Sequence, residues 1–187
     1  MNLPNKLTIL RLIMIPVFIA VFFITSLPCN FIIAAVIFCL AAITDFLDGY
    51  IARKYNLVTN LGKFLDPIAD KVLVASAFII MLVPFGNTLA ILPWYASIGV
   101  ALILARELIV SGFRMVAASK GVVLAADKSG KIKTFTQDVA VVVLLVSKAL
   151  SFLPIYYVGI ALFWVSVALT IVSGIECLVK NSTVLKD

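Results

Sequence analysis

Histidine is absent from the 187-residue sequence, and charged residues are scarce. Only 13% of the residues are charged and 64% are hydrophobic, whereas about a quarter of the residues of a soluble domain are charged. The missing histidine excludes a histidine base, a histidine zinc ligand and a Ser-His-Asp triad. The three cysteines, Cys29, Cys39 and Cys177, lack metal-ligand spacing, and we interpret them as small apolar residues of packed or lipid-facing helices. The composition therefore predicts an integral membrane protein.

Six segments are long and apolar enough to cross a bilayer, which requires about 20 residues of helix. They are residues 7–26, 31–51, 65–84, 92–118, 132–153 and 155–179. Turn-forming residues such as Pro28, Gly121 and Pro154 separate them. No long polar linker interrupts the chain. We therefore predict an all-α membrane protein with six transmembrane helices in a single domain over residues 1–187.

The basic residues are distributed unequally between the two ends of these segments. If the helices alternate in direction, all Lys and Arg residues except Lys148 fall toward the side that carries both termini. The positive-inside rule then predicts cytoplasmic termini in the inner, cytoplasmic membrane, with the active site on the cytoplasmic face. The net charge of +6 on that face suits lipid headgroups and phosphates. We expect membrane lipids as partners and no nucleic acid.

Four aspartates lie within 26 residues between two of the apolar segments. Asp45 and Asp48 are three apart at the end of the second predicted helix, and Asp66 and Asp70 are four apart at the start of the third. Where the helix ends meet, four carboxylates repel one another unless they are protonated or bind a cation. All-oxygen ligation favours Mg²⁺, Mn²⁺ or Ca²⁺, and four carboxylates are enough for two metals. Alternatively, each aspartate lies in water at a helix end, where Asp66 would be favourable without any function.

Small residues and an arginine accompany the aspartates. Gly49 and Ala52 follow on the same helix and leave space for a ligand to approach its backbone. Gly62 does the same from the predicted loop between Lys54 and Leu65. Arg53 offers a planar, permanently charged fork to a phosphate. Together with the aspartates, these residues favour a metal and phosphate site over four unrelated surface acids.

The residues from Asp45 to Asp70 follow the pattern D-x2-D-G-x2-A-R-x8-G-x3-D-x3-D without a departure. This pattern resembles the signature of the CDP-alcohol phosphatidyltransferase family. The resemblance implies transfer of a substituted phosphoryl group from CDP-diacylglycerol, or a related CDP-alcohol, to a second alcohol, with release of CMP. It further implies two divalent cations, Mg²⁺ or Mn²⁺, and a homodimer.

The resemblance also implies a role for each residue of the pattern. One metal would be held by Asp45, Asp48 and Asp66, and the second would be contacted by Asp45, Asp66 and Asp70. Asp70 would also accept the proton of the acceptor hydroxyl as the catalytic base. The CDP site would be lined by Gly49, Ala52, Arg53 and Gly62.

Charges elsewhere in the chain bear on the acceptor alcohol. Arg106 lies about 18 Å above the cytoplasmic end of the fourth predicted helix, at about 1.5 Å per residue, and charge at that depth is costly. Arg114 lies two turns further on, with Glu107 and Ser111 on the same face. We predict that Arg106 and Arg114 bind an acceptor phosphate. The alternatives are an ion pair of Arg106 with an acid on a neighbouring helix and snorkelling of Arg114 to the interface.

Lys131 and Lys133 enter the fifth predicted helix from the cytoplasm. Lysines beside the free N–H groups of a helix N-terminus form an anion site, and a basic membrane anchor is the alternative. With Arg106 and Arg114 they favour a phosphorylated acceptor. The stretches ARELIVSGFR and GKIKT also resemble the members of the family that use glycerol 3-phosphate, which implies phosphatidylglycerophosphate as the product. Phosphatidylglycerol and a phosphorylated inositol are alternative acceptors.

An ion-coupled transporter is the alternative from another class of protein, because acids in membrane helices also carry ions and protons. The aspartates lie at helix ends rather than at mid-membrane, and no inverted repeat is visible. Both observations favour the transferase.

Overall fold

The protein is described by a computed structural model, and the part of the chain that it describes contains six α-helices. The structure describes residues 3–24, 26–54, 60–84, 90–120 and 128–181. The helices are α1 (Leu3–Phe23), α2 (Asn30–Lys54), α3 (Asn60–Met81), α4 (Ala96–Ser119), α5 (Lys128–Leu150) and α6 (Leu153–Lys180). The prediction of an all-helical chain is therefore confirmed for the described residues, in which every regular element is a helix.

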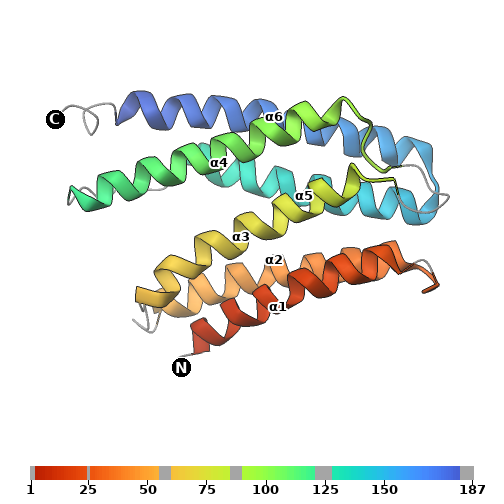
Figure 1. Cartoon of the computed structure of the whole chain (residues 1–187), viewed down its shortest axis with the longest axis horizontal. Coiled ribbons are helices and arrows are strands. Elements are labelled where there is room, and N and C mark those ends of the chain that lie inside the picture. Colours follow the sequence, from red (N-terminus) through yellow and green to blue (C-terminus); the bar gives the residue numbers. More distant parts are fainter. Residues whose placement is uncertain (1–2, 25, 55–59, 85–89, 121–127, 182–187) are drawn as a thin grey trace.

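The helices run lengthwise beside one another (Figure 1). The main packing partners are α1 with α2 and α3, α5 with α6, α4 with α6, and α2 with α5, which connects the two halves of the bundle. The start of α1 and the end of α6 lie at the same end of the molecule, as an even number of alternating helices requires. Short connections between long antiparallel helices produce this arrangement.

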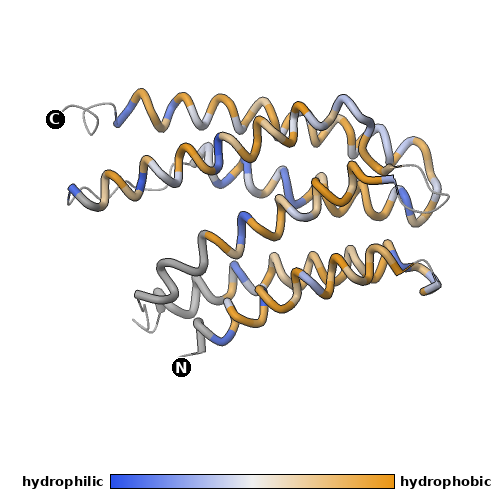
Figure 2. Tube along the Cα trace, viewed as in Figure 1, coloured by the Kyte–Doolittle hydropathy of each residue, from blue (hydrophilic) through white to orange (hydrophobic). Residues whose placement is uncertain are grey.

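Large apolar side chains line both the interior and the exterior of the bundle. Phe18 of α1 packs on Phe38 of α2, with ring centroids 5.8 Å apart, and Phe78 of α3 packs on Phe163 of α6 at 5.2 Å. Most residues along the described helices are hydrophobic (Figure 2). Many large hydrophobic side chains are exposed on the outside, and Leu108 of α4 is 73% exposed. Exposed apolar surface on this scale is rare in soluble proteins and is suited to contact with lipid.

Among the described residues, three helical segments are long and apolar enough to cross a membrane: Lys6–Phe23, Ala96–Ala118 and Leu153–Lys180. A shorter apolar helical segment spans Asn30–Asp45. These segments identify a membrane protein, in agreement with the prediction from composition.

Four helices begin four or more residues away from the predicted start. The first begins at Leu3 rather than at residue 7. The fourth helix begins at Ala96 rather than near residue 92, because Pro93–Tyr95 form a turn in which the N–H of Ala96 donates to the carbonyl of Pro93. The third begins at Asn60, so the prediction that Gly62 lies in a loop is wrong. The cost of glycine in a helix is only about 1 kcal/mol relative to alanine, which does not prevent the helix from extending. The fifth begins at Lys128, four residues before the predicted start.

Candidate active site

An ion pair between α1 and α2 holds the first aspartate of the sequence motif. Arg11 Nη1 donates to Asp45 Oδ1 over 2.5 Å. The side chain of Arg11 is completely buried, whereas that of Asp45 is 41% exposed. Arg11 lies one and a half turns from Lys6, where the long apolar part of α1 begins, and a buried guanidinium requires an anionic partner. The pair therefore fixes α1 against the helix end that carries the motif.

Asp70 of α3 lies close enough to Asp45 for their charges to interact. A third carboxylate, Asp138 of α5, interacts electrostatically with both. Asp138 has no role predicted from the sequence. The sequence does indicate Asp138, because this acid directly precedes the apolar run VAVVVLLV. A charged residue inside a membrane-length segment is the same criterion that identified Arg106. The structure thus brings acids from three helices into one region.

The other residues of the motif lie on the same two helices. Asp48, Gly49, Ala52 and Arg53 fall within α2, and Gly62 and Asp66 fall within α3. Their side chains and surroundings lie outside the described part of the structure. Their predicted roles stay predictions.

The donor chemistry of the described acids fits a divalent cation. Asp45, Asp70 and Asp138 supply only oxygen donors, which suit Mg²⁺ or Mn²⁺. The cations whose charges reach Asp70 include Arg11 and Lys133, and each of them also binds a carboxylate, Asp45 and Glu107 respectively. Asp70 and Asp138 make no ion pair among the described residues, so a bound metal would neutralise these two carboxylates. Among the described side chains no three metal-binding residues are close enough to form a ligand set, and two predicted ligands, Asp48 and Asp66, are not among them.

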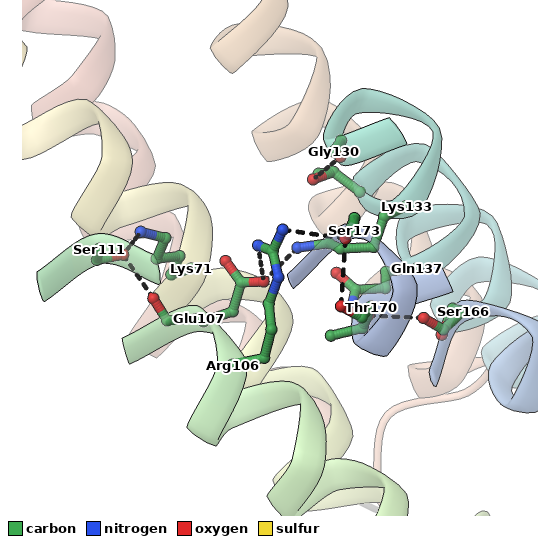
Figure 3. A network of polar contacts seen from close by, with 11 residues as sticks. Lys71, Arg106, Glu107, Ser111, Gly130, Lys133, Gln137, Ser166, Thr170 and Ser173 are labelled. Carbon is green, nitrogen blue, oxygen red and sulfur yellow. Dashed lines mark hydrogen bonds and ion pairs between the residues drawn. The ribbon is translucent and has the colours of Figure 1, made fainter. Parts of the chain in front are cut away.

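A second cluster of charges joins α4, α5 and α6 (Figure 3). Glu107 Oε1 accepts hydrogen bonds from Arg106 Nη1, over 3.1 Å, and from Lys133 Nζ. The side chains are 13%, 15% and 4% exposed, respectively. The sequence analysis proposed an acid on a neighbouring helix as the alternative partner of Arg106, whereas the structure pairs it with the adjacent residue. This charge-paired cluster of Arg106, Glu107 and Lys133 carries a net charge of +1.

Hydroxyl groups surround the charge-paired cluster, and each has a fixed direction. Ser173 of α6 donates to the carbonyl of Thr170 and accepts from Arg106 Nη2 over 3.0 Å. Ser111 of α4 donates to the carbonyl of Glu107 and accepts from Lys71 Nζ. A hydroxyl has a single proton, so its remaining lone pairs face the cations. The hydroxyls therefore orient Arg106 and Lys71 without competing as donors.

The four predicted acceptor-binding residues have different surroundings. Arg106 and Lys133 share one carboxylate. Arg114 and Lys131 are exposed, and the charge of Arg114 interacts with that of Lys71. The expectation that Lys133 lies beside the free N–H groups of a helix start is wrong, because α5 begins at Lys128 and Lys133 is in its second turn. Its side chain, rather than the helix terminus, supplies the positive charge.

The two clusters adjoin each other. The charges of Lys133 and Glu107 both act on Asp70. Asp70 therefore interacts electrostatically with Asp45 and Asp138 and also with Lys133 and Glu107 of the charge-paired cluster. Such a site can bind a phosphorylated molecule beside a carboxylate that accepts a proton.

The chain belongs to the CDP-alcohol phosphatidyltransferase family, whose characteristic sequence matches residues 1–172. The family and the transferase class predicted from the sequence are thereby confirmed. The match favours the transferase over the ion-coupled transporter.

Curated relatives resemble the chain over nearly its whole length. A protein of Bacillus subtilis is 42% identical, with 99% of this chain and 97% of the relative covered. A protein of Rickettsia bellii is 46% identical, with 92% and 91% covered. One of Shigella flexneri is 40% identical, with 95% and 93% covered. Each bears the name CDP-diacylglycerol–glycerol-3-phosphate 3-phosphatidyltransferase.

We predict that Glu107→Ala destabilises the protein by about 3–5 kcal/mol, because it leaves two largely buried cations without their shared carboxylate. Reversible unfolding in mixed detergent micelles measures the change. Glu176→Ala is the matched control: Glu176 is an acid of α6 that makes no ion pair within the described residues. Equal stability of the two variants would contradict the structural role of Glu107.

Proposed function

We propose that this chain transfers the phosphatidyl group of CDP-diacylglycerol to glycerol 3-phosphate, which gives phosphatidylglycerophosphate and CMP. The observation that carries the proposal is the position of Lys133, a largely buried cation whose charge acts on Asp70 and which shares the carboxylate of Glu107 with Arg106. A phosphorylated acceptor needs positive charge at a short distance from the group that receives its proton. The names of relatives that are 40–46% identical support the same pair of substrates.

In this mechanism Arg106 and Lys133 bind the phosphate of glycerol 3-phosphate. Charge-assisted hydrogen bonds from a guanidinium and an ammonium are suited to that group. The exposed Arg114 and Lys131 attract the phosphate toward the site. Binding by these residues places the free hydroxyl of the acceptor near Asp70.

The acceptor hydroxyl then attacks the phosphorus atom attached to diacylglycerol. Asp70 receives the hydroxyl proton, a new P–O bond forms, and the bond from this phosphorus to the bridging oxygen of CDP breaks. CMP leaves with that oxygen. Phosphoryl transfer depends mainly on positioning and on neutralisation of charge. Asp70 is suited to the role because the charge of the acceptor cation Lys133 and that of Asp45 both act on it.

The metal and nucleotide sites follow from the sequence motif. Asp45, Asp48, Asp66 and Asp70 would hold two divalent cations, Mg²⁺ or Mn²⁺. When bound, the cations would supply positive charge that stabilises the phosphate oxygens in the transition state. Gly49, Ala52, Arg53 and Gly62 would line the CDP site. The support is the donor chemistry of the described acids and the family's signature.

The distribution of charged and aromatic residues supports a position in the inner, cytoplasmic membrane with six transmembrane helices. Blue, hydrophilic positions of α1, α3 and α4 lie toward the end at which α1 begins (Figure 2). Near the start of α4, Tyr95 stacks on Trp164 with centroids 6.4 Å apart, and Trp94 is 82% exposed. Trp and Tyr favour the membrane–water interface, and basic ends favour the cytoplasm. We propose that the termini and the active site lie on the cytoplasmic side, and that residues 1–187 form one domain.

A homodimer is proposed from the family alone, and the mass of the protein in detergent, measured by light scattering, checks it. A monomeric mass at working concentration would contradict it.

We expect purified protein to release CMP from CDP-diacylglycerol when glycerol 3-phosphate is present, and to stop when a chelator removes divalent cations. A panel of acceptors tests the specificity: glycerol 3-phosphate, phosphatidylglycerol, inositol phosphate and unphosphorylated glycerol. CMP release with glycerol at the rate found with glycerol 3-phosphate would contradict the role of the buried cations. Faster CMP release with phosphatidylglycerol or inositol phosphate would identify that molecule, instead of glycerol 3-phosphate, as the acceptor.

We expect Asp70→Asn to lower kcat by about 10²–10⁴-fold, because an amide does not accept the hydroxyl proton. The variant keeps the shape of the side chain, so its unfolding temperature in detergent should stay near that of the original protein. Glu176→Gln is the control, because it also replaces a carboxylate by an amide but does so on α6. This variant should retain activity. Retained turnover in Asp70→Asn would exclude this residue as the base.

A further inference from the structure

The C-terminal half of α6 approaches the stem of Arg106 more closely than a side chain would permit. A Cβ atom added at Gly174 would lie 2.9 Å from Arg106 Cγ and 3.4 Å from Nε. Real Cβ atoms essentially never make contacts below 3.0 Å. Cγ is near the base of the side chain, so the arginine cannot avoid the clash by moving its tip alone. Gly174 is thus the residue that permits Arg106 to lie against α6.

The residue before Gly174 directs the guanidinium. Ser173 Oγ is 3.0 Å from Arg106 Nη2, and its own proton is donated to the carbonyl of Thr170. Ser173 is only 2% exposed, so water does not readily replace it. Ser173 is therefore a fixed hydrogen-bond acceptor for the guanidinium of Arg106. In Figure 3 the guanidinium lies between Glu107 on its own helix and Ser173 across the helix interface.

The remaining donors of Arg106 are left for a ligand. A guanidinium has five N–H groups, and the described contacts use Nη1 toward Glu107 and Nη2 toward Ser173. Among the described residues, Nε is buried without a hydrogen-bond partner. Buried donors are normally satisfied, and a phosphate oxygen would satisfy this one.

We propose that Gly174 and Ser173 are positioning residues for the acceptor: they fix the Arg106 guanidinium so that its free donors meet the phosphate of glycerol 3-phosphate. The inference rests on the proposed function, because it presumes that Arg106 binds the acceptor. It extends the acceptor site to α6, which carries none of the residues predicted from the sequence. A displacement of Arg106 weakens binding of the acceptor and leaves the CDP-diacylglycerol site intact.

The test compares Gly174→Ala with Gly112→Ala in the full-length protein. Both add one methyl group to a helix interior, but nothing lies within 4 Å of a Cβ at Gly112. We expect Gly174→Ala to raise the KM for glycerol 3-phosphate about tenfold, since misplacement by about 1 Å can cost up to 10²-fold. The KM for CDP-diacylglycerol and the kcat at saturating acceptor should stay within about twofold. Gly112→Ala should change none of these values.

A second measurement does not require turnover. Glycerol 3-phosphate should raise the unfolding temperature of the original protein and of Gly112→Ala, because a ligand stabilises the folded state that binds it. The same concentration of glycerol 3-phosphate should raise the unfolding temperature of Gly174→Ala by a smaller amount. Ser173→Ala removes the oxygen that accepts the hydrogen bond from Arg106, and it adds no volume. It should therefore weaken binding of glycerol 3-phosphate in the same way, even if Gly174→Ala folds poorly.

A double-mutant cycle decides whether Gly174 acts through Arg106. Once Arg106→Ala has raised the KM for glycerol 3-phosphate, Gly174→Ala should add no further increase. An equal increase in both backgrounds, or a Gly174→Ala variant that behaves like Gly112→Ala, would overturn this inference alone. An unchanged KM in Arg106→Ala would overturn the acceptor role of Arg106, and this inference with it.

Discussion

The buried pairing of Glu107 with Arg106 and Lys133 is the interaction on which the arrangement of α4, α5 and α6 depends. Each charge would be costly to bury alone in an apolar bundle, and the shared carboxylate offsets that cost. α4 and α5 each pack on α6, and the ion pair between Lys133 and Glu107 links them to each other. The pairing therefore constrains the relative positions of two helices whose outer surfaces are otherwise apolar. It also holds Lys133 where its charge acts on Asp70.

Much of the fold could be predicted from the sequence, because the segments of about 20 apolar residues are visible without any tertiary information. Helix ends were less predictable. Gly62 and Lys128 lie in segments with turn-forming or charged residues, where the gain from extending a helix by a turn is only a few kcal/mol or less. The position of Pro93 explains why α4 begins later than its hydropathy suggests.

The candidate site was predictable in part. The depth of Arg106 in an apolar segment identified it without a structure, and the same criterion applied to Asp138 would have added it. The partners of these charges were not predictable. Glu107 and Lys133 are 26 residues apart, and Arg106 and Ser173 are 67 apart. Such contacts depend on which helices are neighbours, and a single sequence contains no direct record of that.

The fixed direction of the hydroxyl groups gives the site an electrical polarity. Ser111, Thr170 and Ser173 each donate their proton to a carbonyl of their own helix, so they present only oxygen lone pairs outward. These lone pairs attract ammonium and guanidinium groups and repel anions. In the proposed acceptor site, these lone pairs would repel a phosphate from the hydroxyl side, so the phosphate would approach Arg106 from another direction. The hydroxyl groups would then select the direction of approach of an anion.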